Sequence, residues 1–433
     1  MKKKNWYPLD NAAKLYPAIS NERRPNQFCF SCILNETVDK EKLQQAVDIV
    51  LSRTPTYKTK LKKGIFWYYL EQNKKPFYIE EENPNFLKFI DFKANNDYLF
   101  KVFYRENKIS LVTFHALTDG GGALQIFKFI LIEYLILTGK KIKTEGKVKS
   151  IMTPFTQADC TDNFVQNFKK SKTKQPKIKK AFKTDGTNFD FDGYGVITGK
   201  VDTAKLKALA KEHNTTITGF LAGLYMHCIY KAFIKNKKVK NKMVRILIPA
   251  DMRKHYPCTT LRNFTLFARP YHDFEKEITL KQCIESCSTQ IKEGLTKERL
   301  DALIYDNVKI EKNWFMKIVP LFLKDLVIRM TYSKVGENLQ TGDLSNIGIV
   351  DLPTSAMPYI KDFVMAISPT YTCKQTMSVI TYNNSTNITV AREFVENTME
   401  KEFFTTLSKM GLEVEISSNY WEAQLWNTVN IAI

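Results

Sequence analysis

The sequence predicts an α/β protein made of two domains. The chain is 433 residues long, which exceeds what one ordinary hydrophobic core accommodates. Hydrophobic residues make up 44% of it and aromatic residues 12%, a composition typical of globular proteins. Strand-like segments alternate with amphipathic helical segments on both sides of a lysine-rich stretch near the middle of the chain. We therefore expect two domains built from similar elements.

The first half of the chain predicts strands interleaved with two helices. Residues up to Pro25 indicate loop and extended chain, and an alternating run at Gln27–Leu34 predicts a strand. A helix follows, with Asp39 as its capping residue. Further along we expect a strand at 65–70, a hairpin formed by 99–104 and 109–114, and a long apolar helix after Gly122.

The second half repeats this order of elements. A strand at 195–201 leads into a helix that Asp202 or Thr203 can cap, and Thr218 can cap the next helix. The other expected elements are strands at 243–249, 266–269 and 347–350, a helix at 280–292, and a hairpin formed by 376–381 and 387–391. Residues 138–183 are rich in lysine, which indicates an exposed connection between domains. We accordingly place the domains at residues 1–175 and 190–433.

The charge of the chain favours anionic partners. The formal net charge is +20, which suits a phosphorylated cofactor, an acidic carrier protein, a membrane surface or nucleic acid. Nucleic acid is disfavoured, because the lysines lie in runs without interleaved aromatic residues or a recognition motif. No segment has the pattern of a secretory signal, and the most apolar helix, at 123–137, is too short to cross a bilayer. We expect a cytoplasmic protein without a membrane span.

The eight cysteines indicate neither disulfides nor a metal site. Cys29 and Cys32 lie three residues apart in a predicted strand, so their side chains would point to opposite faces. Cys283 and Cys287 lie four apart on a predicted helix, without a second pair or a neighbouring histidine to complete a site. Ordinary reduced thiols are the better interpretation.

The segment from His115 to Gly122 carries the most compact set of chemical groups. His115 follows the strand at 109–114, so a sheet sets its position, and an imidazole with an ordinary pKa near 6.5 can accept and return a proton near neutral pH. Asp119 could orient this ring or fix the loop through an arginine. The glycines after it reduce the bulk where a ligand would approach. A histidine at a strand end is also commonly structural, so chemistry alone leaves its role open.

These residues resemble the His-x-x-x-Asp-Gly motif of the acyltransferase superfamily. This superfamily includes chloramphenicol acetyltransferase, the condensation domains of peptide synthetases, plant acyltransferases and alcohol acetyltransferases. Five further segments look like the alcohol acetyltransferase branch: Tyr7-Pro8-Leu9-Asp10, Phe66-Trp67-Tyr68, Pro249-Ala250-Asp251-Met252-Arg253, Leu261-Arg262-Asn263-Phe264 and Ser345-Asn346-Ile347-Gly348. The resemblance spans most of the chain. The Asp-Phe-Gly-Trp-Gly loop of the plant enzymes has no clear copy here.

The resemblance implies two similar halves, each a mixed sheet layered with helices, with a tunnel between them. It implies an acyltransferase in which His115 is the general base. This enzyme would move an acyl group from a CoA or carrier-protein thioester to the hydroxyl or amine of a small acceptor. Asp119 would hold its loop by pairing with an arginine. Arg253 matches the family's arginine in its Asp-x-Arg setting, and Arg23 and Arg24 are its rivals.

The resemblance also suggests further roles and partners. The candidates for substrate binding are Gly120, Gly121, Ser345 and Asn346. The last two would hydrogen-bond the developing oxyanion or line the tunnel, or else form a simple turn before a strand. We expect acyl-CoA as a co-substrate or an acidic acyl carrier protein as a partner, no permanently bound cofactor or metal, and a monomer. The alternative is a protein of the same fold that binds an acyl or peptidyl ligand without catalysis.

Overall fold

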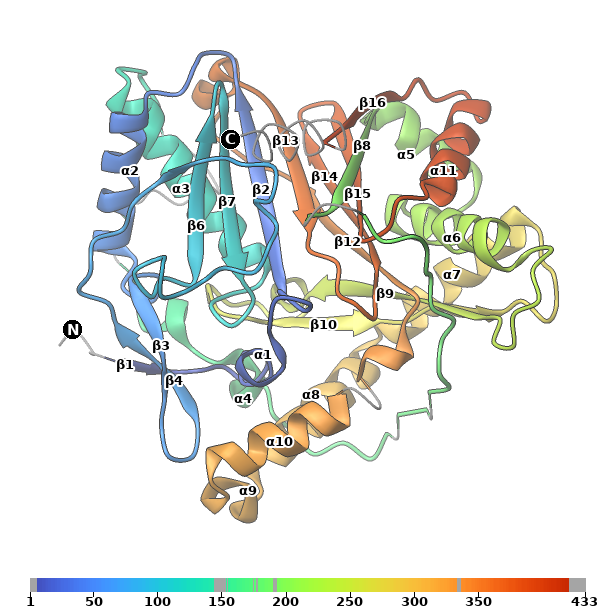
Figure 1. Ribbon diagram of the computed structural model, residues 1–433, viewed down its shortest axis with the longest axis horizontal. Coiled ribbons are helices and arrows are strands. Elements are labelled where there is room, and N and C mark those ends of the chain that lie inside the picture. Colours follow the sequence, from blue (N-terminus) through green and yellow to red (C-terminus); the bar gives the residue numbers. More distant parts are fainter. Residues whose placement is uncertain are drawn as a thin grey trace.

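The computed structural model describes residues 6–143, 153, 155–173, 175–176, 178–189, 193–332 and 336–419. Over these ranges the strands form a five-stranded, an eight-stranded and a three-stranded sheet. The two larger sheets lie side by side, with helices packed on them (Figure 1). The α/β class that the sequence predicts is confirmed.

The five-stranded sheet belongs mainly to the first half of the chain. Across the sheet the strands are β13 (Ile360–Ile367), β2 (Gln27–Leu34), β7 (Lys108–Phe114), β6 (Phe100–Arg105) and β5 (Glu80–Glu81). The predicted strand β2 and the predicted hairpin β6–β7 are both present, and the hairpin turns at Glu106, which has a φ of 49°. The buried strand β2 pairs with β7 on one side and β13 on the other.

Two helices pack against this sheet, α2 (Lys40–Arg53) and α3 (Gly120–Leu137). As predicted, Asp39 caps α2 by accepting hydrogen bonds from the backbone of Glu41 and Lys42. Helix α3 begins three residues earlier than the sequence pattern suggested. By length and composition, α3 and the stretch Ile217–Ile234 could each cross a membrane. For α3 this is contrary to the expectation that the helix is too short. However, 61% of α3 and 78% of Ile217–Ile234 are buried inside the protein.

The eight-stranded sheet belongs to the second half. Its path is β10 (Thr265–Ala268), β9 (Met243–Asp251), β12 (Gly342–Ile349), β14 (Gln375–Tyr382), β15 (Ser385–Arg392), β8 (Gly195–Asp202) and β16 (Glu415–Ser418), and β11 (Tyr271–Asp273) pairs with β9. Strand β12 runs parallel to β9 and β14, whereas the other pairs are antiparallel. The sheet is therefore mixed.

Four helices of the second half are α5 (Thr203–Glu212), α6 (Ile217–Ile229), continued by a π-helical turn at Tyr230–Ile234, α7 (Leu280–Gly294) and α11 (Thr398–Lys409). Asp202 caps α5, which confirms one of the two predicted alternatives. The predicted cap of α6 is wrong: Thr216 caps this helix, because its hydroxyl accepts from the backbone of Gly219, whereas Thr218 lies inside the first turn.

A third group of elements lies at the foot of the molecule in Figure 1. It comprises β1 (Trp6–Pro8), β4 (Tyr68–Gln72) and β3 (Thr59–Lys63), which form the three-stranded sheet, and the helices α1 (Tyr16–Ile19), α4 (Asn163–Gln166), α8 (Lys297–Lys312), α9 (Trp314–Ile318) and α10 (Leu321–Thr331). Short 3-10 turns occur at Ala158–Cys160, Met252–Lys254, Glu337–Leu339 and Thr354–Tyr359. Of this group only strand β4 was expected, and it begins three residues later than the strand predicted at 65–70.

The connection between the halves is partly buried, against the expectation of a wholly exposed segment. Phe164 in α4 is 1% exposed and packs in a cluster with Phe264 and Leu300. Residues 144–152, 154, 174 and 177 of this connection lie outside the described residues. The division at 1–175 and 190–433 stays a prediction. The second half nevertheless supplies β13 to the first sheet, so the two halves are interlocked.

Candidate active site

His115 lies directly after β7, on the wall of a cavity between the two sheets. Its backbone N–H donates to the carbonyl of Asn26 at 3.0 Å, and its carbonyl accepts from Nδ2 of Asn263 at 3.0 Å. The imidazole stacks on Tyr16, with ring centroids 5.0 Å apart, and leans against Phe28 at 4.6 Å. Its Nδ1 atom has no hydrogen-bond partner among the described residues. The ring is thus fixed by packing and by its backbone.

The surroundings of His115 keep its imidazole neutral. Burial lowers the pKa of this ring from 6.5 to about 4, because an apolar site disfavours the charged form. The negative charge of Asp119 opposes this effect without outweighing it. At neutral pH the imidazole therefore has a lone pair that can accept a proton.

Asp119 is engaged on both carboxylate oxygens. It caps α3 by accepting from the backbone of Gly122 at 3.0 Å, and it accepts from the backbone of Phe264 at 2.7 Å and the hydroxyl of Thr265 at 3.0 Å. The two Nη atoms of Arg253 complete the set, each at 3.0 Å. Burial raises the pKa of Asp119, but the charge and hydrogen bonds of Arg253 hold it below its ordinary value. This carboxylate fixes the loop and is ionised.

Arg253 is the partner of Asp119, as the Asp-x-Arg segment predicts. Its guanidinium also donates to Asp251 at 2.9 Å and to the carbonyls of Thr260 and Arg262 at 2.9 and 2.6 Å. Such a bidentate, fully bonded arginine fixes the relative position of the segments that it joins.

The rival arginines are placed elsewhere. Arg24 donates to the carbonyl of Ile19 and the hydroxyl of Tyr371, and Arg23 is exposed. The choice between the three arginines is thereby settled for Arg253.

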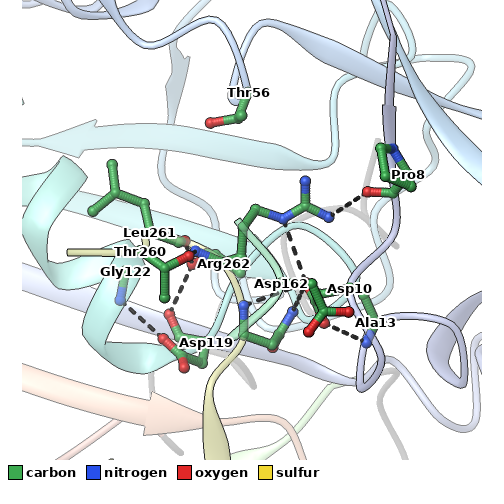
Figure 2. Close-up of polar contacts among 12 residues, drawn as sticks. Pro8, Asp10, Ala13, Thr56, Asp119, Gly122, Asp162, Thr260, Leu261 and Arg262 are labelled. Carbon is green, nitrogen blue, oxygen red and sulfur yellow. Dashed lines mark hydrogen bonds and ion pairs between the residues drawn. The ribbon is translucent and has the colours of Figure 1, made fainter. Parts of the chain in front are cut away.

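A second network ties the N-terminal segment to the same loop, as Figure 2 shows. Asp10 accepts from the backbone of Ala13 at 2.8 Å, from Nδ2 of Asn263 at 3.2 Å and from Nε of Arg262 at 3.4 Å, and Arg262 also donates to the carbonyl of Pro8 at 3.1 Å. Since Asn263 also holds the carbonyl of His115, this network sets the position of the histidine. The network joins two of the segments that resemble the acyltransferase superfamily, residues 7–10 and residues 261–264.

The glycines of the motif allow close approach of the two halves. A Cβ atom on Gly122 would lie 2.3 Å from the carbonyl oxygen of Leu261 and 2.1 Å from Oγ1 of Thr118, which itself donates to that carbonyl at 2.5 Å. The helix therefore starts against backbone of the second half. Gly120 and Gly121 line the cavity, and Cβ atoms on them would come within 3.1 Å of Ile347 and 3.0 Å of Arg253.

The cavity has a volume of about 960 Å³ and walls from both halves. Of the predicted site residues, those that line it are His115, Asp119, Gly120, Gly121, Ser345 and Asn346. Arg253 stands behind Asp119 and is not part of the wall. A cavity of this size is large enough for a ligand of drug-like dimensions.

Ser345 and Asn346 lie within β12, so the interpretation as a simple turn is wrong. The side chain of Asn346 donates to the hydroxyl of Thr218 at 3.0 Å and accepts from the backbone of Gly348 at 2.9 Å. The pairing of β12 with β14 shifts at this point, and Gly348 has a φ of 84°. The hydroxyl of Ser345 makes no hydrogen bond within the described ranges, which leaves it available to a ligand.

Sequence reasoning missed two ionisable residues on the cavity wall, Asp343 and Arg269. Burial raises the pKa of Asp343 to about 6 and lowers the pKa of Arg269 below its ordinary value. Oδ1 of Asp343 and Nε of Arg269 have no hydrogen-bond partner in the part of the chain that is described. Asp343 precedes Ser345 by two residues in one strand, so strand alternation could have identified it.

Tyr16, stacked on His115, was also missed. Its helix α1 has only four residues, too few for a periodic pattern. Among the described residues no group of three or more His, Cys, Asp or Glu side chains is placed to hold a metal ion.

Comparisons with known proteins identify the fold. No family model matches the chain, and no curated protein matches its sequence. Among solved structures, F. graminearum TRI101 complexed with coenzyme A and deoxynivalenol matches with a TM-score of 0.59 at 8% identity, over 92% of this chain and 96% of that one. The TRI3 trichothecene 15-O-acetyltransferase from Fusarium sporotrichioides matches with a TM-score of 0.56 at 10% identity, over 93% and 95%.

A condensation domain matches equally well in extent. The starter condensation domain of rhizomide synthetase RzmA, in complex with C8-CoA, has a TM-score of 0.54 at 11% identity over 93% of this chain and 94% of its own. Similarity at these identities defines the fold. The chain therefore has the two-lobed fold that CoA-dependent acyltransferases share with condensation domains.

Proposed function

We propose that this protein is an acyltransferase that moves an acyl group from a CoA thioester to the hydroxyl or amine of a small acceptor, with His115 as the general base. The observation that carries the proposal is the placement of a neutral imidazole on the wall of a cavity that both halves line. The neighbouring carboxylate of Asp119 is bound by Arg253. Asp119 therefore stabilises the loop, and His115 is the group that accepts the proton.

In the proposed reaction the imidazole of His115 takes the proton of the acceptor's O–H or N–H. The acceptor atom then forms a bond to the thioester carbonyl carbon, and the carbonyl oxygen becomes negative. When the C–S bond breaks, the carbonyl re-forms and the departing sulfur receives the proton from the imidazolium. Such general base catalysis contributes about 10²–10⁴-fold, so orientation of the two reactants and stabilisation of the oxyanion must supply the rest.

We assign stabilisation of the oxyanion to Ser345. Its hydroxyl is on the cavity wall and has no protein partner within the described residues. Asn346 is bonded to Thr218 and Gly348, which suits a positioning role. Gly120 and Gly121 would let the substrate approach the start of α3.

Two observations support CoA as the donor. The chain carries a net charge of +20, which attracts a polyphosphorylated molecule, and structures of the same fold were solved in complex with coenzyme A or C8-CoA. An acidic acyl carrier protein would benefit from the same charge. Since one chain supplies both walls of the cavity, we propose a monomer that needs no permanently bound cofactor.

The decisive experiment is thiol release from acyl-CoA by the purified protein, with a panel of alcohols and amines as acceptors. His115→Ala should lose about 10²–10⁴-fold in rate. His213→Ala is the matched control, because His213 ends α5 away from the cavity. If no acceptor gives release above that of His115→Ala, the proposal fails. Tight acyl-CoA binding without turnover would instead establish the non-catalytic alternative.

A further inference from the structure

Helices α9 and α10 expose an unusually apolar surface. The exposed apolar side chains of this region are Ile310, Trp314, Phe315, Ile318, Phe322, Leu323, Leu326, Val327 and Met330, here called the apolar arm. Trp314 is 71% exposed and Phe322 is 70% exposed. Monomeric soluble proteins seldom expose contiguous apolar patches beyond a few hundred Å² without a functional reason. The arm projects from the foot of the molecule (Figure 1).

Helix α10 is inverted relative to an ordinary surface helix. Two of its three charged residues, Lys324 and Asp325, are 2% and 8% exposed, whereas Arg329 and most of its apolar residues face outward. A surface helix normally turns its apolar stripe inward. The inversion is stabilised by specific bonds: Lys324 donates to the carbonyl of Phe66 at 2.8 Å, and the hydroxyl of Tyr68 donates to Asp325 at 2.7 Å. The apolar face is thus held outward by buried polar contacts.

The arm is attached to a second exposed apolar element. The backbone N–H of Leu321 donates to the carbonyl of Ile65 at 2.8 Å, in the turn between β3 and β4. In this turn Ile65 is 76% exposed and Phe66 is 41% exposed. At the other end of α10, Nε of Arg329 donates to the carbonyl of Ala18 at 2.6 Å. The arm and the turn therefore form one continuous, anchored surface.

The charges beside this surface are mainly positive. The exposed lysines on or next to it are Lys62, Lys63, Lys309, Lys312 and Lys317. The acidic groups of the arm are engaged in the protein, because Glu311 pairs with Lys14 and Asp325 is buried against Tyr68. Tryptophan, phenylalanine and leucine next to lysine are the composition of segments that lie in the interface of an anionic bilayer.

We propose that the apolar arm docks the protein on the surface of an anionic lipid bilayer without crossing it. The bilayer is favoured over a second copy of this chain, because two surfaces with the same lysines and a net charge of +20 each repel one another. The combination of exposed tryptophan and phenylalanine with lysine is typical of segments at a bilayer interface, which favours a bilayer over an acidic protein. A bilayer satisfies both the charges and the apolar side chains.

The arm also borders the cavity that contains His115. Ile310, Met316, Lys324, Ile328 and Tyr332 line this cavity. A docked protein would therefore present its cavity near the lipid, and a lipid-soluble acceptor or acyl donor would enter from the membrane. This consequence rests on the proposed acyl transfer, whereas the docking itself does not.

The test is sedimentation of the purified full chain with vesicles of phosphatidylcholine alone or phosphatidylcholine mixed with phosphatidylserine. We expect binding to the anionic vesicles that weakens as salt is added. The triple variant Trp314→Ser, Phe322→Ser, Val327→Ser should bind at least about tenfold more weakly, since each lost side chain removes buried apolar area. The matched control is Tyr271→Ser, Ile349→Ser, Ile416→Ser, which removes three exposed apolar side chains outside the arm and should bind like the original.

Equal binding of the arm variant and the original would overturn the proposal. So would a dimer in sedimentation equilibrium that the arm variant dissociates, together with no vesicle binding. Both triple variants should keep the melting temperature of the original, because the replaced side chains are exposed. Thiol release with a water-soluble acceptor separates the two proposals: if the original binds vesicles but releases no thiol, docking stands and acyl transfer falls.

Discussion

At the scale of single residues, the environment of His115 determines its chemistry. Packing against Tyr16 and Phe28 removes water from the ring, and burial lowers its pKa from 6.5 to about 4. The ring is a weaker base than a solvated imidazole, yet its neutral form is fully populated at neutral pH. No hydrogen bond joins Asp119 to the ring among the described residues, because the carboxylate is bound by Arg253 and by the start of α3.

The first prediction concerns the pH dependence of kcat/KM. Protonation of His115 removes the base, so kcat/KM should fall as the pH drops through about 4. Between about pH 5 and neutral pH, including at pH 6.5, kcat/KM should not change through this group. The same shift lowers fold stability between pH 6.5 and about 4, because the unfolded state binds the proton more readily there. A profile of kcat/KM against pH checks this prediction, because kcat/KM reports the ionisation of groups in the free enzyme. An acid limb centred near 6.5 would contradict it.

The second prediction concerns Ser345. Ser345→Ala should lower kcat by about 10²–10³-fold with little change in KM, as expected when one oxyanion donor is lost. Ser378 is the matched control: it pairs with Ser345 across β12 and β14, but its hydroxyl donates to the carbonyl of Met365 at 2.6 Å. Ser378→Ala should affect stability and leave kcat unchanged. An unchanged kcat in Ser345→Ala would remove the serine from the mechanism.

The third prediction concerns the pair of Asp119 and Arg253. Arg253→Met leaves a buried carboxylate without its cation and should reduce the free energy of unfolding by about 3–5 kcal/mol. In the background of Asp119→Asn the same change should cost much less, because the amide is neutral. Urea unfolding of both single variants and the double variant measures this coupling. Additive costs would show that the two side chains do not act as a pair.

At the scale of elements, the sequence pattern located most strands of the two larger sheets and the helices α2, α3, α5, α6 and α7. It missed β13 and the helices α8 to α10, and it misplaced a helix start where one residue has two tasks. Asp119 was expected to orient the imidazole or to pair with an arginine, and not to cap a helix, so the start of α3 was placed after Gly122. In the structure its two oxygens serve both Arg253 and the backbone of Gly122, and the helix begins at Gly120. A carboxylate with several acceptor sites can cap and pair at once, which a pattern of single roles does not predict.

The fourth prediction follows from the start of α3. Gly122→Ala should destabilise the protein by about 1–3 kcal/mol, because the methyl group would overlap the carbonyl of Leu261 and the hydroxyl of Thr118. Gly294→Ala is the matched helical control, since its nearest atom would be Cβ of Ala268 at an ordinary 3.5 Å. This control should be neutral or slightly stabilising. Thermal unfolding of both variants distinguishes them, and an equally stable Gly122→Ala would refute the tight contact.

At the scale of the whole molecule, the motif segments indicated much of the site, whereas tertiary placement supplied the rest. His115, Asp119 and Arg253 belong to local patterns, and the structure brings them together as those patterns imply. Arg269 reaches the cavity because β10 pairs with β9. The local spacing of residues in the sequence does not predict that pairing. Strand β13 was not predicted, and even a predicted strand does not name its partner, so the exchange of β13 between halves was not foreseen.

The fifth prediction tests the interlocking of the halves. A fragment of residues 1–189 lacks β13 and would leave the buried strand β2 as an exposed, apolar sheet edge, which favours aggregation. We expect it to be insoluble or to unfold without cooperativity, and to become soluble when residues 190–433 are produced with it. A full chain cut by a protease at an inserted site near residue 190 is the control, because all strands are then present and the fold should persist. A soluble fragment of residues 1–189 that unfolds cooperatively by itself would show that the first half is an independent domain.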